Sequence, residues 1–402
     1  MDSSANKLQS APPAQRKYRR VATIFVVFVV FFILLLLAHP AFTHLRAAGL
    51  LLRFQDPNQS GIVAGLSTYP VVETLTDVAT PSETIRARLY IPKGVAHAPG
   101  IVIVHGVHHL GIDEPRLVRF ARAMSASGIR VLTPELAALA DYQIDGHSIV
   151  LIGYSARSFS ADVGQKVGVL GLSFAGGLAL LAACDPQYEP YIRFVVSVGA
   201  HDDLERVSEF LVANTIPRPD GTILQMAAHE YGPLVLIYSH VEDFFPPADL
   251  KVAREALRLL LWEQVDDSRK QSERLSPPSR QKMDLLYKHD VDALAGEMKQ
   301  SIVRHHAEMF PVSPHGHMAS LHVPVFLLHG AADNVIPPTE LLWLQQDVPA
   351  KVLRGALISH AISHVSMEGE PSFSDKFRLV HFMAQVLAMA DDSRAADVKP
   401  VH

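Results

Sequence analysis

One apolar run with a serine at its centre constrains the fold of this chain most strongly. Residues 167–180 read VGVLGLSFAGGLAL, so β-prone residues precede Ser173 and small or apolar residues follow it. Gly171, Ala175 and Gly176 surround the serine with side chains small enough to avoid a clash on a very sharp turn. The pattern predicts a strand that turns abruptly into a helix, with the hydroxyl of Ser173 projecting from the turn.

Short apolar runs alternate with helical patterns along most of the chain. A helix is predicted at 114–128, where apolar residues repeat at helical spacing before a glycine. Because the apolar runs have no polar face and are separated by helices, we expect an α/β fold with a mostly parallel sheet covered by helices on both faces. Strands are predicted at 85–92, 100–106, 129–136, 166–173, 193–200, 323–330 and 351–359.

A long segment of different texture separates two of these strands. Residues 205–320 contain amphipathic helical patterns divided by a polar break. We expect this segment to be a helical cap inserted over one edge of the sheet, where it would limit access to Ser173. The sheet domain then has two parts, 84–204 and 321–389, and a solvated tail follows at 390–402.

The N-terminal region contains the longest uncharged run. Residues 21–38 carry no charge, and eighteen helical residues span about 27 Å, roughly the hydrocarbon core of a bilayer. Five basic residues and one acidic residue precede the run. By the positive-inside rule we expect 1–20 to be a cytoplasmic tail, 21–38 a transmembrane anchor and 39–83 a juxtamembrane connector, with the catalytic domain outside the cytoplasm. A cleaved signal peptide is the alternative, but no small-x-small cleavage site follows the run.

Composition excludes several classes of function. The formal net charge of −5 gives no basic surface for a nucleic acid. Cys184 is the single cysteine, so an intramolecular disulfide and a cysteine-based zinc site are excluded, and its apolar surroundings indicate a buried structural thiol. The 21 histidines include the pairs His108-His109 and His305-His306, but none has the i, i+4 spacing beside a carboxylate that zinc hydrolases show. We expect these histidines to be solvated or to cap helices, with no metal and no cofactor.

A serine nucleophile needs a histidine base and a carboxylate to orient that base, and both follow predicted strands. Asp333 comes shortly after the strand at 323–330. His360 and His364 follow the last strand, and we assign His364 as the base because the strand is expected to run as far as His360. The chain order of serine, aspartate and histidine is the one that this chemistry takes on one large α/β fold.

Two backbone N–H groups are predicted to form an oxyanion hole. The strand at 100–106 ends in His105-Gly106, and we assign the N–H of Val107 in the following loop as the first donor. The second donor is the N–H of Phe174, directly after the nucleophile. His105 and His108 are expected to shape this loop.

Several weaker patterns have structural alternatives. Ser155 also follows an apolar run in a Gly-x-Ser context, but Arg157 is not small and no apolar helix follows, so we interpret it as part of a surface turn. His201-Asp202-Asp203 follows a strand, where it either contacts substrate or caps a helix. For Ser173 and Asp333 the alternatives are a structural serine and a turn-forming aspartate.

These motifs resemble those of the α/β-hydrolase family across 84–204 and 321–389. The elbow GLSFA has Ala175 where the family most often has a second glycine, and HGVHH followed by VLTPEL looks like the dienelactone-hydrolase-like and acetyl-esterase-like branch. Dienelactone hydrolase proper uses a cysteine nucleophile, and this chain has Ser173 in that place.

The resemblance implies a serine hydrolase that cleaves carboxylic esters, and the predicted anchor at 21–38 would hold it in a membrane. Ser173 would attack the carbonyl, His364 would act as base and then as acid, and Asp333 would orient it, while Val107 and Phe174 hold the oxyanion. The expected partners are a small ester and, through the N-terminal helix, a lipid bilayer, but no nucleic acid. A peptidase or amidase with the same triad and a catalytically silent binding module are the alternatives.

Overall fold

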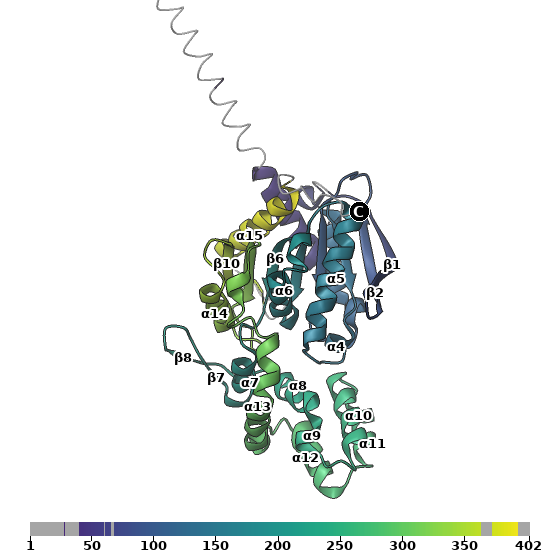
Figure 1. Ribbon diagram of the computed structural model, residues 1–402, viewed down its shortest axis with the longest axis vertical. Helices are drawn as coiled ribbons and strands as arrows, with labels where there is room; N and C mark the ends of the chain where they lie inside the picture. The colour runs from purple at the N-terminus through teal and green to yellow at the C-terminus, as the bar shows by residue number, and fades with distance from the viewer. Residues whose placement is uncertain (1–27, 29–39, 60, 66–67, 363–371, 393–402) are drawn as a thin grey trace, which may run out of the picture.

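The central element of the protein is a sheet of eight strands with helices on both faces (Figure 1). A computed structural model describes residues 28, 40–59, 61–65, 68–362 and 372–392. The strands are β1 (Val71–Ala79), β2 (Thr84–Pro92), β3 (Gly100–Val104), β4 (Arg130–Pro134), β5 (Val167–Leu172), β6 (Ile192–Val198), β9 (Val325–Gly330) and β10 (Leu353–Ser359). Their order across the sheet is β1-β2-β4-β3-β5-β6-β9-β10.

Most neighbouring strands of the sheet are parallel. Strand β2 pairs antiparallel with β1 and β4, and the other neighbours pair parallel. The register sets Val104 beside Gly171, and Gly330 beside Ser359, so β3, β5, β9 and β10 end at one edge of the sheet. Parallel α/β sheets place their sites at this carboxyl-terminal edge.

Alternate residues of the central strands pack against opposite layers of helices. The helices of the two layers are α3 (Pro115–Ala126), α5 (Gly146–Val163), α6 (Phe174–Cys184), α14 (Thr339–Asp347) and α15 (Phe373–Asp391). On one face of the sheet, Val102 and Val104 of β3 pack in a core with residues of α5, α6 and α14. On the other face, Ile101 and Ile103 pack in a core with residues of the helical segment 40–55, α3 and α15. Burial of both faces explains the uninterrupted apolar runs and confirms the predicted α/β sheet.

All seven predicted strands lie in the sheet, but β1 was not predicted. It falls inside 39–83, and its sequence VVETLTDVA alternates polar and apolar residues. Strand β1 is at the end of the sheet and pairs only with β2, so most of its residues remain partly or fully exposed. An edge strand of this kind lacks the apolar run that identified the others.

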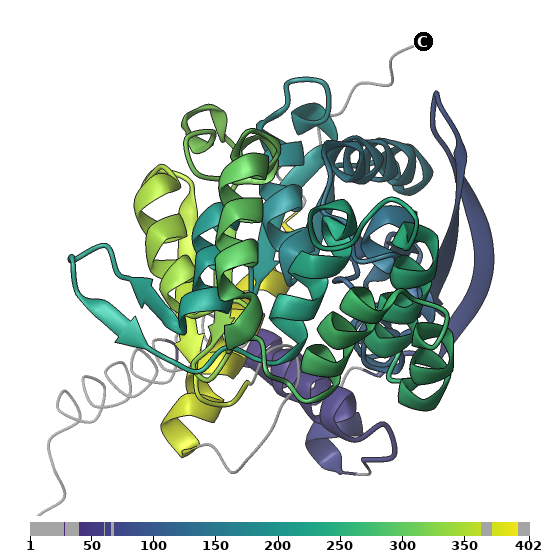
Figure 2. The ribbon, with the colours of Figure 1, turned by 90° about the horizontal axis from the view of Figure 1, so that it is seen from below.

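The long insertion forms a separate helical body beyond the carboxyl-terminal edge of the sheet (Figures 1 and 2). Its own hydrophobic core includes Leu236, Leu257, Met283 and Met298, which come from four different helices. A short hairpin that the sequence analysis did not predict extends from it. The elements are α7 (Leu204–Ala213), β7 (Thr215–Pro217), β8 (Ile223–Gln225), α8 (Tyr231–Ser239), α9 (Val241–Phe244), α10 (Leu250–Leu261), α11 (Val265–Ser272), α12 (Pro277–Tyr287) and α13 (Ala295–Met309).

The interpretation of Ser155 as part of a surface turn is wrong. Ser155 lies within α5, is fully buried, and its hydroxyl donates to the carbonyl of Leu151 at 2.8 Å. The side chain of Asp145 caps the start of this helix, and Gly164 ends it with a φ of 75°. The polar residues that suggested a turn lie on the same helix as the buried apolar ones, which is the usual pattern of a helix on a sheet surface.

Among the residues that the structure describes, no helix is long and apolar enough to cross a membrane. The predicted tail at 1–20 and all of the predicted anchor at 21–38 except Phe28 lie outside the described residues. The same is true of 393–402, the main part of the predicted C-terminal tail.

Candidate active site

Ser173 lies on the turn between β5 and α6, at the carboxyl-terminal edge of the sheet. Its backbone has φ 55° and ψ −137°, a conformation that residues other than glycine rarely adopt. The N–H of Ser173 donates to the carbonyl of Val198, and the carbonyl of Ser173 accepts from the N–H of Gly176, both at 2.8 Å. The side chain is buried, and Oγ has no hydrogen-bond partner among the described residues.

Two glycines make this turn sterically possible. A Cβ at Gly171 would lie only 2.3 Å from the carbonyl oxygen of Ala175. A Cβ at Gly106, after β3, would lie 3.0 Å from the Cβ of Ser173. The loop after β3 therefore passes directly beside the serine, as an oxyanion loop must.

His105 fixes the orientation of that loop. The N–H of Leu136 donates to His105 Nε2 at 3.0 Å, so the ring proton is on Nδ1, which donates to the carbonyl of Gly106 at 2.7 Å. Burial lowers the pKa of His105 and keeps the ring neutral. Because a trans peptide directs its C=O and N–H to opposite sides, this bond turns the N–H of Val107 away from His105.

Neither of the two assigned oxyanion donors has a competing partner among the residues that the structure describes. The N–H of Val107 makes no hydrogen bond in the described part of the chain. The N–H of Phe174 is at the first position of α6, where a helix has no internal acceptor for it. Both donors flank Ser173, so they are available to an oxyanion formed there.

Asp333 lies in the loop after β9 and is fully buried. Its Oδ1 accepts hydrogen bonds from the N–H groups of Val335 and Ile336 at 3.0 and 3.1 Å. The adjacent Ala331 N–H donates to the carbonyl of Ser359, the last residue of β10, at 2.9 Å. The segment that leaves β10 therefore begins beside the Asp333 loop.

The structure places one of the two histidine candidates. His360 directly follows β10, and its side chain is exposed. His364 lies outside the described residues. Ser173, Asp333 and the start of the histidine segment are thus brought to one edge of the sheet, and the choice between the two histidines stays a prediction.

The sequence analysis did not identify His329, a buried histidine that lies beside Asp333. His329 Nε2 lies 2.8 Å from the carbonyl of Ile336 and 3.5 Å from Asp333 Oδ2, which fixes the loop around the carboxylate. The sequence does contain a pattern that could have identified it. β9 ends in His329-Gly330, and the same His-Gly pair, His105-Gly106, directly follows β3.

A cavity of about 950 Å³ lies between Ser173 and the helical insertion. The hydroxyl of Tyr231, at the start of α8, donates to the carbonyl of Val107 at 3.2 Å, so the insertion contacts the oxyanion loop directly. His109 is partly buried and stacks on Trp262 with ring centroids 5.2 Å apart, so it packs against the insertion. The wall contributed by the insertion includes Tyr231, Leu234, Leu260, Trp262, Leu286 and Tyr287.

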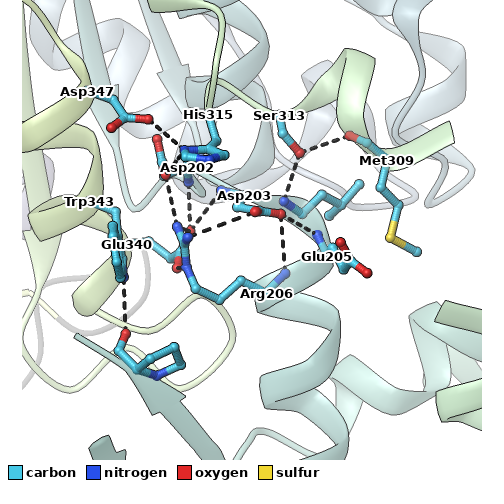
Figure 3. Close-up of polar contacts among 12 residues, drawn as sticks. Asp202, Asp203, Glu205, Arg206, Met309, Ser313, His315, Glu340, Trp343 and Asp347 are labelled. Atoms are coloured by element: carbon cyan, nitrogen blue, oxygen red, sulfur yellow. Dashed lines mark hydrogen bonds and ion pairs between the residues drawn. The ribbon is translucent and has the colours of Figure 1, made fainter. Parts of the chain in front are cut away.

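A buried network of charged groups joins both ends of the insertion to the sheet domain (Figure 3). Arg206, in α7, donates to Glu340 at 2.7 Å and to Asp202 at 2.9 Å. Glu340, in α14, also accepts from the N–H groups of Asp202 and Asp203. Asp203 caps α7 by accepting from the N–H of Arg206 at 3.3 Å, so the capping alternative is the one observed. His315, after α13, contacts Asp347 at 2.8 Å.

Asp202 gives this network a dependence on pH. Burial and the neighbouring Glu340 raise the pKa of Asp202 from 3.8 to about 7. Between these two values the folded protein holds a proton that the unfolded chain releases, so stability falls as pH rises from about 4 to about 7. In Asp202→Asn this fall is expected to become smaller, since an amide does not titrate between these pH values.

Melting temperatures from pH 4 to pH 8 check this expectation. The exposed Asp284→Asn substitution is the matched control and should follow the wild-type profile. An Asp202→Asn profile that is parallel to wild type over the whole range would contradict the assignment.

Cys184 ends α6 and is partly buried. Burial raises the pKa of its thiol to about 11. The thiol is therefore protonated at neutral pH and unreactive, as expected for a structural cysteine.

Comparisons with known proteins give only distant structural likenesses. No protein-family model matches the sequence, and no curated protein matches it. The esterase domain of a Rhodothermus marinus protein is 13% identical over 80% of this chain and 98% of that chain, with a TM-score of 0.42. An acylaminoacyl peptidase is 11% identical over 85% of this chain and 44% of that chain, with a TM-score of 0.47. A puromycin-hydrolyzing peptidase of Mycobacterium tuberculosis is 15% identical over 86% of this chain and 42% of that chain, with a TM-score of 0.45. The chain thus spans less than half of the two peptidase structures.

Proposed function

We propose that this protein is a serine hydrolase of the α/β-hydrolase type that cleaves carboxylic esters through an acyl-enzyme on Ser173. The observation that carries the proposal is the strained turn that holds Ser173 with its Oγ buried and without a hydrogen-bond partner in the described part of the chain. Strain of this kind is kept at sites where it serves function. The N–H of Val107, which no described residue accepts, and the buried Asp333 at the same sheet edge support the same chemistry.

The proposed mechanism has two halves. Ser173 Oγ bonds to the ester carbonyl carbon while His364 takes the hydroxyl proton, and the N–H groups of Val107 and Phe174 stabilise the negative oxygen of the tetrahedral intermediate. The intermediate collapses, the C–O bond to the alcohol breaks, and His364 returns the proton to the alcohol. Water then attacks the acyl-enzyme with the same proton transfers and releases the acid. Asp333 orients His364 throughout.

The cavity favours a small substrate over a polypeptide. Its volume of about 950 Å³ is within the range of small-molecule sites, and helices of the insertion form one wall. A peptidase or amidase would use the same triad, with an amine as the leaving group. Matched p-nitrophenyl esters and p-nitroanilides of graded acyl length separate these functions. We expect turnover of short esters and little turnover of anilides, and the reverse preference would replace the esterase proposal with the peptidase one.

Asp333→Asn is expected to lower kcat by about 10⁴-fold, because an amide cannot stabilise the imidazolium form of the base. The turn should persist, since the amide oxygen still accepts from the N–H groups of Val335 and Ile336. Steady-state kinetics with a p-nitrophenyl ester measures the effect, and the neighbouring Asn334→Ala serves as the control with near wild-type kcat. Wild-type kcat in Asp333→Asn would remove Asp333 from the mechanism.

We also propose that residues 21–38 anchor the protein in a membrane with the catalytic domain outside the cytoplasm. The uncharged run and the five basic residues before it support this placement. A reporter that works only outside the cytoplasm should be active when fused to the C-terminus. Activity of a cytoplasm-only reporter would overturn the topology, and release of a shortened soluble protein would favour a cleaved signal.

A further inference from the structure

Three side chains of types that commonly bind metals lie close together within the helical insertion. His240 lies between α8 and α9, Glu242 lies in α9, and His305 lies in α13. Each offers one ligand atom, and these atoms lie within 4.8 Å of one another. The rings of His240 and His305 are stacked, with centroids 3.7 Å apart and an angle of 15° between the planes. The geometry points to a divalent transition-metal site formed by His240, Glu242 and His305.

The second ring nitrogen of His305 has the partner that metal-binding histidines usually have. His305 Nε2 lies 3.1 Å from Asp243 Oδ2, and a carboxylate only accepts, so Nε2 carries the proton. The other ring nitrogen, Nδ1, is buried and has no hydrogen-bond partner among the described residues. A carboxylate that holds one imidazole nitrogen while the other binds a metal is a recurrent arrangement.

The carboxylates near these three ligands outnumber the guanidinium groups that lie beside them. Glu308 Oε2 lies 3.1 Å from His305 Nδ1, outside hydrogen-bond geometry. Arg304 pairs with Asp243, and Arg254 lies 3.6 Å from Glu242. Three carboxylates are therefore balanced by two guanidinium groups. A dication bound between these atoms would supply positive charge where carboxylates outnumber guanidinium groups by one.

His240 is also placed to bind a metal. Its side chain is partly buried and makes no hydrogen bond to any other described residue. Its ring stacks on His305, so the imidazole nitrogens of the two residues lie close together.

The donor set identifies the class of metal. Two imidazole nitrogens and one carboxylate oxygen suit Zn²⁺ and similar borderline ions, whereas Mg²⁺ and Ca²⁺ prefer oxygen ligands alone. A second group, Asp202, His315 and Asp347, also has ligand atoms within 4.8 Å of one another. There, however, the guanidinium of Arg206 lies 2.9 Å from Asp202 Oδ2 and already supplies the positive charge (Figure 3). We therefore assign the metal to the first group.

A metal at this site would stabilise the position of α8, the helix whose first residue lines the active-site cavity. It would link the end of α8 to α13, two segments that are distant in the sequence. The first residue of α8 is Tyr231, which lines the cavity and donates to the carbonyl of Val107. The role assigned to the ion is structural, because its ligands lie at the opposite end of α8 from Tyr231.

Titration of the full-length protein with Zn²⁺ alone, after removal of metals with a chelator, tests the site. We expect one tight site per chain, measured by competition with a chromophoric chelator, and a melting temperature that rises with Zn²⁺ concentration. Affinity should fall at least about 10-fold in Asp243→Asn, which keeps all three ligands, and further in His240→Ala and His305→Ala. Co²⁺ in the same site should give the visible absorption of a four-coordinate ion.

Matched controls make the result decisive. His306→Ala is the next residue on α13 and is exposed, and His315→Ala belongs to the second group, so both should bind Zn²⁺ as wild type does. Glu242→Gln changes an exposed side chain and keeps the fold, so it should lose affinity even if a histidine variant does not fold. The absence of tight binding to wild type, unchanged affinity in Glu242→Gln, or equal loss in His315→Ala would overturn the site. Ser173→Ala should bind Zn²⁺ normally, so this test does not depend on the proposed hydrolase activity.

Discussion

Ser173→Ala is expected to lower kcat by about 10⁴- to 10⁶-fold while the protein remains folded. The substitution removes the atom that forms the acyl bond, and the remaining groups cannot form that bond. Folding should survive because Oγ has no hydrogen-bond partner among the described residues, so no hydrogen bond to that part of the chain is lost. Alanine keeps the same backbone cost at a φ of 55° that serine has. The melting temperature should therefore equal or slightly exceed that of wild type.

Labelling with a fluorophosphonate measures the same prediction without a known substrate. Wild type should be labelled at one position, and Ser173→Ala should not be labelled. Ser155→Ala is the matched control, because Ser155 is also buried in a Gly-x-Ser context but donates to Leu151 inside a helix. That variant should label as wild type does. A folded wild type that takes up no probe and hydrolyses no short-chain ester would exclude the enzyme and favour a binding module.

The sheet could be predicted because its central strands are buried on both faces. Each residue of β3 is buried, so the sequence GIVIV needs no polar position. The same rule could not find β1, whose alternating residues face solvent, nor could it assign Ser155 to α5. In both cases the tertiary surroundings decide the structure, and a short sequence window contains little of that information.

The positions of Ser173 and Asp333 could also be predicted, because parallel strands end at one edge and collect the residues that follow them. The residues that form the wall of the cavity could not be predicted in this way. Tyr231 and Trp262 come from separate helices of the insertion, whose packing has no period in the sequence. The contact of His240 with His305 was hidden for the same reason, since spacing along one helix was the only test for a metal site that the sequence allowed.

His364→Ala is expected to abolish turnover, on the order of 10⁶-fold in kcat, while His360→Ala keeps most activity. A base must come within hydrogen-bond distance of the serine oxygen. Ser173 is buried, whereas His360 is exposed and directly follows the last residue of β10. Four further residues of chain can extend up to about 14 Å, which gives His364 a reach that a residue fixed at the strand end lacks.

Kinetics of the two single variants decides between the histidines. Each should be compared with wild type for kcat, for fluorophosphonate labelling and for melting temperature, because loss of the base must slow labelling without unfolding the protein. Slow labelling in His364→Ala with a wild-type melting temperature would support the assignment. Slow labelling in His360→Ala alone would move the base to the strand end and require the exposed ring to turn toward the cavity. If both variants label at the wild-type rate, neither histidine activates Ser173, and the buried His329 beside Asp333 becomes the next residue to substitute.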